Sequence, residues 1–258
     1  MRILAIHAHP DDIESLAAGT LALLAERGHD ITIATMTPGD CGSAEHSPEE
    51  ISAIRRGEAT RAAALIGAAY LCVESRDLAV FNDDATRRTV TEILRRTRPE
   101  LVLAPSPADY MCDHEAASVL VRDACFGAPA PNYNTRAASP APPLRAIPHL
   151  YWMDPIGGVD RDDRLVAPDF VVDVGKTQAI KREMLACHAS QRAWLMKHHG
   201  LDDYVENMDR TTALRGKLVN VAYGEGFRLY KGHPYPQTPL LEQALGGELV
   251  HVYGAVEK

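Results

Sequence analysis

The sequence predicts an α/β fold, in which helices cover both faces of a doubly wound, mainly parallel β-sheet. Short apolar runs that are typical of buried strands lie at residues 3–6, 31–36, 70–73 and 101–104. Segments in which apolar residues recur at helical spacing separate these runs. Such alternation favours a parallel sheet with right-handed crossovers. Since α/β chains of this length commonly form one domain, we expect a single domain over residues 1–258.

The first predicted strand, Ile3 to Ile6, ends in a dense polar turn. The turn reads His7-Ala8-His9-Pro10-Asp11-Asp12, and helical spacing begins at Ile13. Because Pro10 fixes its own φ and pushes His9 toward extended geometry, the chain turns here instead of continuing the strand. The polar residues then lie at the carboxyl end of a strand, where open α/β sheets bind ligands.

His9 and Asp12 are predicted to bind a metal ion. They lie three residues apart across the turn and can converge on one point. A neutral imidazole and a carboxylate are two of the three protein ligands that a catalytic zinc ion usually has. Asp11 lies between them and is free to act as a base on metal-bound water. The alternative is that His9 and Asp11 only cap the next helix, but one cap uses one carboxylate.

A second polar segment, residues 105–115, follows the predicted strand at 101–104. It contains His114, which is the candidate for a third metal ligand because it lies at the matching edge of the sheet. A histidine near a helix start is otherwise a solvated or capping residue. Asp113 would support a ligand or cap the helix.

Helix boundaries carry their own signals. We expect a first helix from Ile13 to Leu24, ended by Gly28 in a left-handed conformation. Ser47-Pro48-Glu49-Glu50 reads as a capping box that starts a second helix, which Gly67 closes. In that helix Arg55 and Glu58 are spaced for an exposed ion pair, yet Glu58 falls on the apolar face. A third helix is expected at residues 84–97.

The second half of the chain gives weaker signals. Residues 127–148 are rich in Pro, Ala and Asn, and they predict a loop that is either a lid over the site or a passive surface excursion. Further strands are expected at 150–153, 170–172 and 227–230, and further helices at 176–188 and 203–223. Beyond Pro234 the periodicity is too weak to predict an element.

The composition indicates a cytoplasmic protein that binds neither nucleic acid nor membranes. The formal net charge of −8 argues against both partners, since both favour basic patches. The five cysteines include no Cys-x-x-Cys pair, which suits reduced thiols better than disulfides or a structural zinc site. The chain starts directly with a strand and shows no leader or transmembrane run. We also expect a homo-oligomer.

The tetrapeptide His9-Pro10-Asp11-Asp12, with Asp113-His114 after a later strand, resembles the LmbE-like (PIG-L) family of metal-dependent N-deacetylases. Weaker similarities are Gly19-Thr20-Leu21, Gly39-Asp40, Arg55-x-x-Glu58, Lys181 to Gln191 and Glu225-Gly226-Phe227-Arg228. The resemblance implies a Rossmann-like fold and a zinc-dependent hydrolase, with another divalent metal such as Fe²⁺ as the alternative. Its partner would be a small amino-sugar substrate, an N-acetylglucosamine-type conjugate that loses its acetyl group.

The resemblance also implies roles for individual residues. The metal ligands would be His9, Asp12 and His114. Asp11 would be the general base, which takes a proton from the attacking water and returns it to the leaving amine. Arg55 and Asp77 would contact the substrate.

Met111 stands where family members often carry a histidine, three residues before the last ligand. Because methionine cannot usefully donate a proton, we expect a nearby residue to stabilise the negative charge on the amide oxygen. Tyr110 is favoured, since it is adjacent and its hydroxyl donates at neutral pH. His188 is the other candidate. Their ordinary alternatives are packing against the Pro-rich loop for Tyr110 and a polar helix end for His188.

Other functions stay open on the sequence alone. One is an amidase that acts on a related sugar–thiol conjugate, and another is a catalytically idle member that only binds a sugar. Two histidines and one carboxylate also form the ligand set of non-haem Fe(II) oxygenases. That last function leaves Asp11 without a role.

Overall fold

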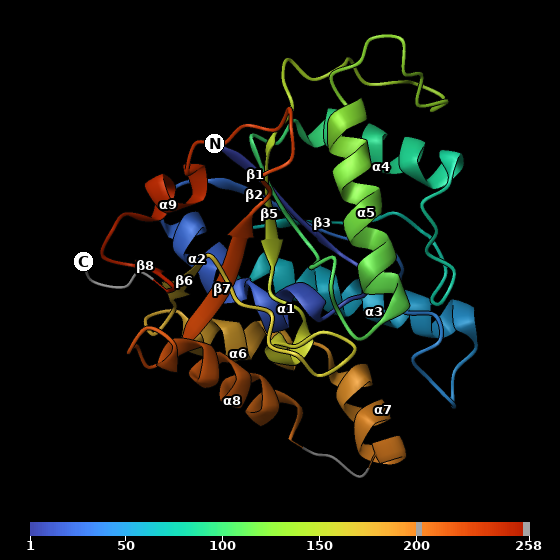
Figure 1. Cartoon of the computed structure of the whole chain (residues 1–258). Helices are drawn as coiled ribbons and strands as arrows, with labels where there is room; N and C mark the ends of the chain where they lie inside the picture. The colour runs from blue at the N-terminus through green and yellow to red at the C-terminus, as the bar shows by residue number, and fades with distance from the viewer. Residues whose placement is uncertain (200–202, 255–258) are drawn as a thin grey trace.

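One eight-stranded β-sheet organises the computed structural model, which describes residues 1–199 and 203–254 (Figure 1). The strand order is β3-β2-β1-β4-β5-β7-β6-β8. The parallel half consists of β1 (Arg2–His7), β2 (Asp30–Thr35), β3 (Ala69–Cys72), β4 (Leu101–Ala104) and β5 (His149–Met153). The predicted doubly wound α/β fold is thus confirmed. Because the chain winds outward from β1 in both directions, β1 and β4 flank the switch point at which such sheets bind ligands.

The other half of the sheet is antiparallel. β7 (Gly224–Leu229) pairs with β5 and with β6 (Phe170–Asp173), and β6 also pairs with β8 (Val250–Val252). A short helix, α9 (Leu240–Leu245), precedes β8. Neither α9 nor β8 is predicted from the sequence, because six and three residues are too few to give a periodic signal.

Helices cover both faces of the sheet, and alternate residues of β1 point to opposite faces. On one face, Ile3 and Ala5 pack in a core with α1 (Asp12–Leu16), α2 (Ala18–Glu26), α3 (Pro48–Ala64) and α6 (Gln178–Ala186). On the other face, Leu4 and Ile6 pack in a core with α4 (Asp84–Thr97) and α5 (Cys112–Gly127). This double burial explains why the first strand reads as an unbroken apolar run.

Several predicted helix boundaries are confirmed. The hydroxyl of Ser47 accepts a hydrogen bond from the Glu50 N–H at 3.2 Å, and the Glu50 carboxylate accepts one from the Ser47 N–H at 2.9 Å. Gly28 and Gly67 follow α2 and α3 with φ angles of 79° and 70°, in the left-handed region that suits glycine. The predicted first helix is broken in two, since Ala17 separates α1 from α2 with a φ of −141°.

The helices of the second half differ more from the prediction. A short 3₁₀ helix, η1 (Ile156–Gly158), follows β5, and α7 (Ala189–His199), which was not predicted, follows α6. The last long helix is α8 (Tyr204–Lys217), which ends earlier than predicted because the chain turns into β7. Both α7 and α8 lie at the end of the molecule toward which β5 runs (Figure 1). No helix within the described residues is long and apolar enough to span a bilayer.

The Pro-rich loop of residues 127–148 is not a lid. It lies at the opposite end of the molecule from α7 and α8 (Figure 1). Its residues 142–148 line a separate groove together with Arg2 and Arg98, which adjoin the amino ends of β1 and β4. None of residues 127–148 lines the cavity at the carboxyl ends of the strands. The surface excursion, the second of the two predicted roles, therefore describes this loop.

A buried ionic cluster fixes α2, α6 and β7 to one another. The carboxylate of Glu225 accepts hydrogen bonds from the backbone N–H groups of Gly19 at 2.9 Å and Thr20 at 2.7 Å, in the first turn of α2. It also accepts one from the ammonium of Lys181 at 2.6 Å, and both charged side chains are only 1% exposed. Negative charge at a helix start is favourable, so one carboxylate satisfies a helix end and a buried cation together.

Replacing Lys181 with methionine is expected to destabilise the fold strongly. Lys181→Met leaves the Glu225 charge buried without its cation, and breaking a buried pair in this way costs about 3–5 kcal/mol. Chemical denaturation measures the loss. The matched control is Lys231→Met, since Lys231 pairs with Asp169 at the surface, where ion pairs contribute little. Equal effects of the two substitutions would contradict the structural role of Lys181.

Candidate active site

A cavity of about 530 Å³ lies at the carboxyl ends of the parallel strands. His9 and Asp12 line it after β1, Asp77 after β3, and Tyr110 and His114 after β4. Asp11, Arg55 of α3 and residues of α7 and α8 complete the lining. The structure therefore brings together every residue predicted as a metal ligand, base or substrate contact.

The turn after β1 holds Asp11 in an unusual conformation. Its φ of 96° lies in the left-handed region, which is uncommon outside glycine but tolerated by Asp. Asp11 precedes α1, yet its side chain makes no capping hydrogen bond to that helix. Instead, its carboxylate accepts a hydrogen bond from the hydroxyl of Tyr204 on α8 and lies 3.7 Å from the guanidinium of Arg55. The helix-cap alternative for Asp11 is therefore wrong.

Asp12 lies at the centre of a histidine cluster. Its Oδ2 lies 2.7 Å from Nδ1 of His7, 3.4 Å from Nδ1 of His9 and 3.4 Å from Nε2 of His114. Burial acts to raise the pKa of Asp12, but His114 and His7 outweigh it and hold this pKa well below its ordinary value. Asp12 is therefore an anion that faces several imidazole nitrogens.

The spacing around Asp12 fits a tetrahedral metal site. Two atoms that bind one zinc ion at its usual bond lengths lie about 3.3–3.5 Å apart. The distances from Asp12 to His9 and to His114 match this value, whereas the 2.7 Å distance to His7 is that of a hydrogen bond. By proximity alone, His7, Asp12 and His114 also form a possible ligand group, with atoms within 4.8 Å of one another. The predicted set of His9, Asp12 and His114 stays a prediction, and His7 is the residue that sequence reasoning missed.

Each of the two predicted histidine ligands has a carboxylate on its other nitrogen. Nδ1 of His114 lies 3.0 Å from Asp109, which is fully buried, and Nε2 of His9 lies 3.2 Å from Asp113. A proton shared with these carboxylates leaves the nitrogen that faces Asp12 unprotonated and available to a metal. Asp113 thus occupies the supporting position that the sequence suggested, while Asp109 was not predicted.

The general-base candidate, Asp11, is buried next to the charged groups of Arg55 and Asp12 and the hydroxyl of Tyr204. Burial raises its pKa, the Arg55 guanidinium opposes this, and the neighbouring Asp12 adds to the rise. Burial also raises the pKa of Tyr204 well above its ordinary value, so its phenol keeps its proton and donates to Asp11. Tyr204 lies 193 residues from Asp11 in the chain, and no local pattern in the sequence indicates this contact.

Arg55 is held by a hydrogen bond to the turn after β1 and by close packing of the loop after β2. Its guanidinium donates a hydrogen bond to the backbone carbonyl of Pro10 at 2.9 Å and is 3% exposed. A side chain at Gly39, which has a φ of 79°, would lie 2.6 Å from that guanidinium. Glu58 does not pair with Arg55 but accepts hydrogen bonds from the N–H and hydroxyl of Ser190 at the start of α7. The exposed-pair alternative is therefore wrong.

Asp77 offers a free acceptor in the cavity. One oxygen accepts a hydrogen bond from the Cys41 N–H at 2.8 Å. The other, Oδ1, is buried without a hydrogen-bond partner among the described residues and lies 3.9 Å from Nε2 of His9. A hydroxyl of a bound ligand would satisfy it.

The two candidates for the missing donor near Met111 differ in position. Tyr110 is 60% exposed, lines the cavity and packs edge-on against His114, with ring centroids 5.6 Å apart. His188 is fully buried, lies 3.2 Å from Glu14 and does not line the cavity. Of the two, only Tyr110 borders the space that a substrate would occupy.

Comparison with known proteins links this site to an enzyme family. Residues 4–125, which carry all the predicted ligand, base and substrate residues, match the family model described as PIG-L, GlcNAc-PI de-N-acetylase. The chain is 26% identical to diacetylchitobiose deacetylase of Thermococcus kodakarensis, over 90% of this chain and 84% of that protein. It is 28% identical to 4-oxalmesaconate hydratase of Pseudomonas putida, over 73% of each chain.

The fold matches as well. The structure of N,N'-diacetylchitobiose deacetylase from Pyrococcus horikoshii superposes with a TM-score of 0.74 at 25% identity, covering 92% of this chain and 88% of that one. The protein TT1542 of Thermus thermophilus superposes with a TM-score of 0.72 at 26% identity, covering 93% and 98%. Over residues 4–125 the chain is similar to the PIG-L (LmbE-like) family, and the proteins that resemble it over most of its length include deacetylases.

Proposed function

We propose that this protein is a zinc-dependent deacetylase, which hydrolyses the N-acetyl group of an N-acetylglucosamine-type amino sugar. The observation that carries the proposal is the spacing around Asp12, whose carboxylate lies at the separation of two metal ligands from one nitrogen of His9 and one of His114. The carboxylate of Asp11 lies beside them and does not cap α1. The deacetylases among its relatives support the same reaction.

The residues of the cavity divide the work of amide hydrolysis. A divalent ion held by His9, Asp12 and His114 would supply a Lewis acid and lower the pKa of a bound water. Asp11 accepts a proton from the attacking water and delivers it to the leaving amine, a transfer that its raised pKa favours. The hydroxyl of Tyr110 donates toward the amide oxygen as negative charge develops there.

Two residues of the cavity bind the sugar. The free oxygen of Asp77 accepts a hydrogen bond from a sugar hydroxyl, and Arg55 donates to a second polar group through its remaining N–H groups. The cytoplasmic location and the homo-oligomer remain predictions from the sequence.

The hydratase relative raises a second function, but the charges in the cavity favour the first. An oxalmesaconate is an anion with several carboxylates, which require cationic partners when they are buried. Among the described residues that line the cavity, Arg55 is the only Arg or Lys, whereas Asp11, Asp12 and Asp77 are acidic. A neutral amide fits this balance better than a multiple anion.

The purified protein is expected to contain one divalent metal per chain, and His114→Ala should lose it. Elemental analysis after dialysis measures the content. His7→Ala should weaken metal affinity by only about 10–100-fold, because His7 hydrogen-bonds to a ligand instead of binding the metal. The control is His149→Ala, since His149 bonds to Thr238 away from the cavity. Full metal content in His114→Ala would disprove the ligand assignment.

Acetate and free amine are expected in equal amounts from N,N'-diacetylchitobiose, also under nitrogen, where an oxygenase would be inactive. Asp11→Asn should keep the metal and lose turnover by about 10²-fold or more, because an amide cannot accept the proton from water. Product release is followed by an amine-reactive dye and an acetate assay. Near-normal turnover by Asp11→Asn would exclude Asp11 as the base. If the wild type releases neither acetate nor amine, the alternatives are a catalytically idle sugar-binding protein or a hydratase.

Tyr204→Phe is expected to lower kcat about 10–100-fold while KM and metal content stay unchanged, because a hydrogen bond to a charged group is lost. This pattern would identify Tyr204 as a residue that positions Asp11. Tyr235→Phe is the control, since Tyr235 donates to the backbone carbonyl of Arg122 outside the cavity. A Tyr204→Phe enzyme with wild-type kcat would show that the contact has no part in the reaction.

A further inference from the structure

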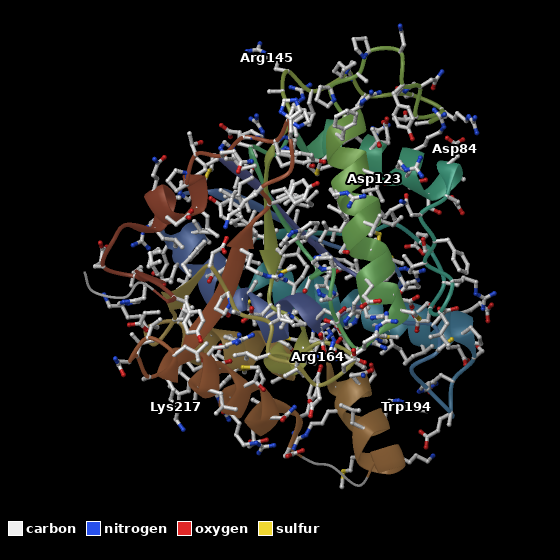
Figure 2. The ribbon with its side chains drawn as sticks, viewed as in Figure 1. Asp84, Asp123, Arg145, Arg164, Trp194 and Lys217 are labelled. Atoms are coloured by element: carbon white, nitrogen blue, oxygen red, sulfur yellow. The ribbon has the colours of Figure 1, made fainter. Side chains whose placement is uncertain are left out.

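The cavity has a second lining that the proposed chemistry does not use. Leu78 and Met111 border it near the proposed metal ligands, and five further apolar side chains, which we call the apolar wall, line the rest: Leu16, Ile156, Trp194, Leu195 and Met208. Trp194 projects from α7 (Figure 2), and Leu195 follows it on the same helix. Both are half-buried and line the cavity.

Two contacts hold the helices of the apolar wall over the catalytic residues. The carboxylate of Glu58 on α3 accepts hydrogen bonds from the N–H of Ser190 at 2.9 Å and from the Ser190 hydroxyl at 2.6 Å. These two bonds fix the start of α7. On α8, the hydroxyl of Tyr204 donates to Asp11. The wall is therefore tied to the same carboxylate that is proposed as the base.

The wall and the catalytic residues come from different parts of the chain. Its members other than Leu16 lie between residues 156 and 208, whereas the family match spans residues 4–125. The family match therefore covers the proposed metal and base residues and Leu16, but not the four wall residues on η1, α7 and α8. The part of the cavity lined by α7 and α8 is the place where substrate choice can be set without change to the chemistry.

The wall selects for apolar groups. Exposed apolar surface in a pocket is unfavourable in water, and a ligand group that covers it gains free energy in proportion to the area buried. Of the described lining residues, Arg55 alone is a fixed cation, and it already bonds to Pro10. Gln191 of α7 and Asn207 and Thr211 of α8, which also line the cavity, carry no charge.

We propose that the substrate is an N-acyl amino sugar that carries an apolar aryl or alkyl group, and that the apolar wall binds this group. The inference rests on the proposed deacetylase function and names the substrate class of the same site. The apolar group is either an aglycone on the sugar or an acyl chain longer than acetyl. Because both have the same chemistry toward the wall, the experiment tests them in separate arms.

The test compares kcat/KM on three probes: N-acetylglucosamine, 4-nitrophenyl N-acetyl-β-glucosaminide and N-hexanoylglucosamine. At least one apolar probe is expected to exceed N-acetylglucosamine by about tenfold or more, as the burial of a ring or short chain implies. The probe that gains identifies the aglycone or the acyl chain as the source. Equal values on all three would overturn the inference.

Calorimetric binding separates this inference from the proposed function. If no probe is hydrolysed, the deacetylase function fails. Tighter binding of the 4-nitrophenyl or hexanoyl sugar than of N-acetylglucosamine would then still support the apolar wall. Equal affinities would reject it.

Variants locate the effect. Trp194→Ala is expected to reduce the ratio of kcat/KM on the apolar probe to kcat/KM on N-acetylglucosamine to near one. Leu195→Ala removes less apolar surface and is expected to reduce this ratio partly. Leu214→Ala is the matched control, because Leu214 is 60% exposed on α8 and does not line the cavity. Metal content confirms that each variant folds. Wild-type preference in both Trp194→Ala and Leu195→Ala would overturn the inference.

Discussion

The buried carboxylate of Asp12 is the interaction on which the candidate site depends. One oxygen faces His7, His9 and His114, so two strand ends, those of β1 and β4, are joined through a single side chain. A buried anion needs such partners, because the free-energy cost of removing an unpaired carboxylate from water would exceed the net stability of the fold. The supporting carboxylates Asp109 and Asp113 then set which nitrogen of each histidine faces inward. The spacing of the proposed metal ligands follows from the need to satisfy this buried charge.

The second half of the chain provides support that the first half lacks. Glu225 of β7 and Lys181 of α6 fix the start of α2, a short distance along the chain from the turn that carries Asp11 and Asp12. On the opposite side of that turn, Tyr204 of α8 restrains Asp11, whose left-handed backbone is costly unless its surroundings hold it. The residues proposed for chemistry thus lie within 4–125, but their geometry depends on elements beyond that range.

The sequence predicted what is local and missed what is distant. Neighbouring residues determine the apolar run of β1, the turn at Pro10 and the capping box at Ser47. The structure contains all three. Asp109 lies five residues before His114, in the loop that leads from β4 into α5, so a search for carboxylates at that strand end would have found it. The contact of Tyr204 with Asp11 spans 193 residues and leaves no local trace. The lid role predicted for residues 127–148 is wrong for a topological reason. Helix α5 returns the chain to the amino edge of the sheet, so the loop that follows it lies far from the carboxyl edge.

In the proposed function, helix α8 would link substrate binding to catalysis. Tyr204 and Met208 lie four residues apart, so they share one face of the helix. Tyr204 contacts Asp11, whereas Met208 belongs to the apolar wall. A substrate group that packs against Met208 would therefore contact the same helix that carries Tyr204. In this arrangement, binding energy from a remote apolar group is available to orient the base, which would appear in kcat as well as in KM.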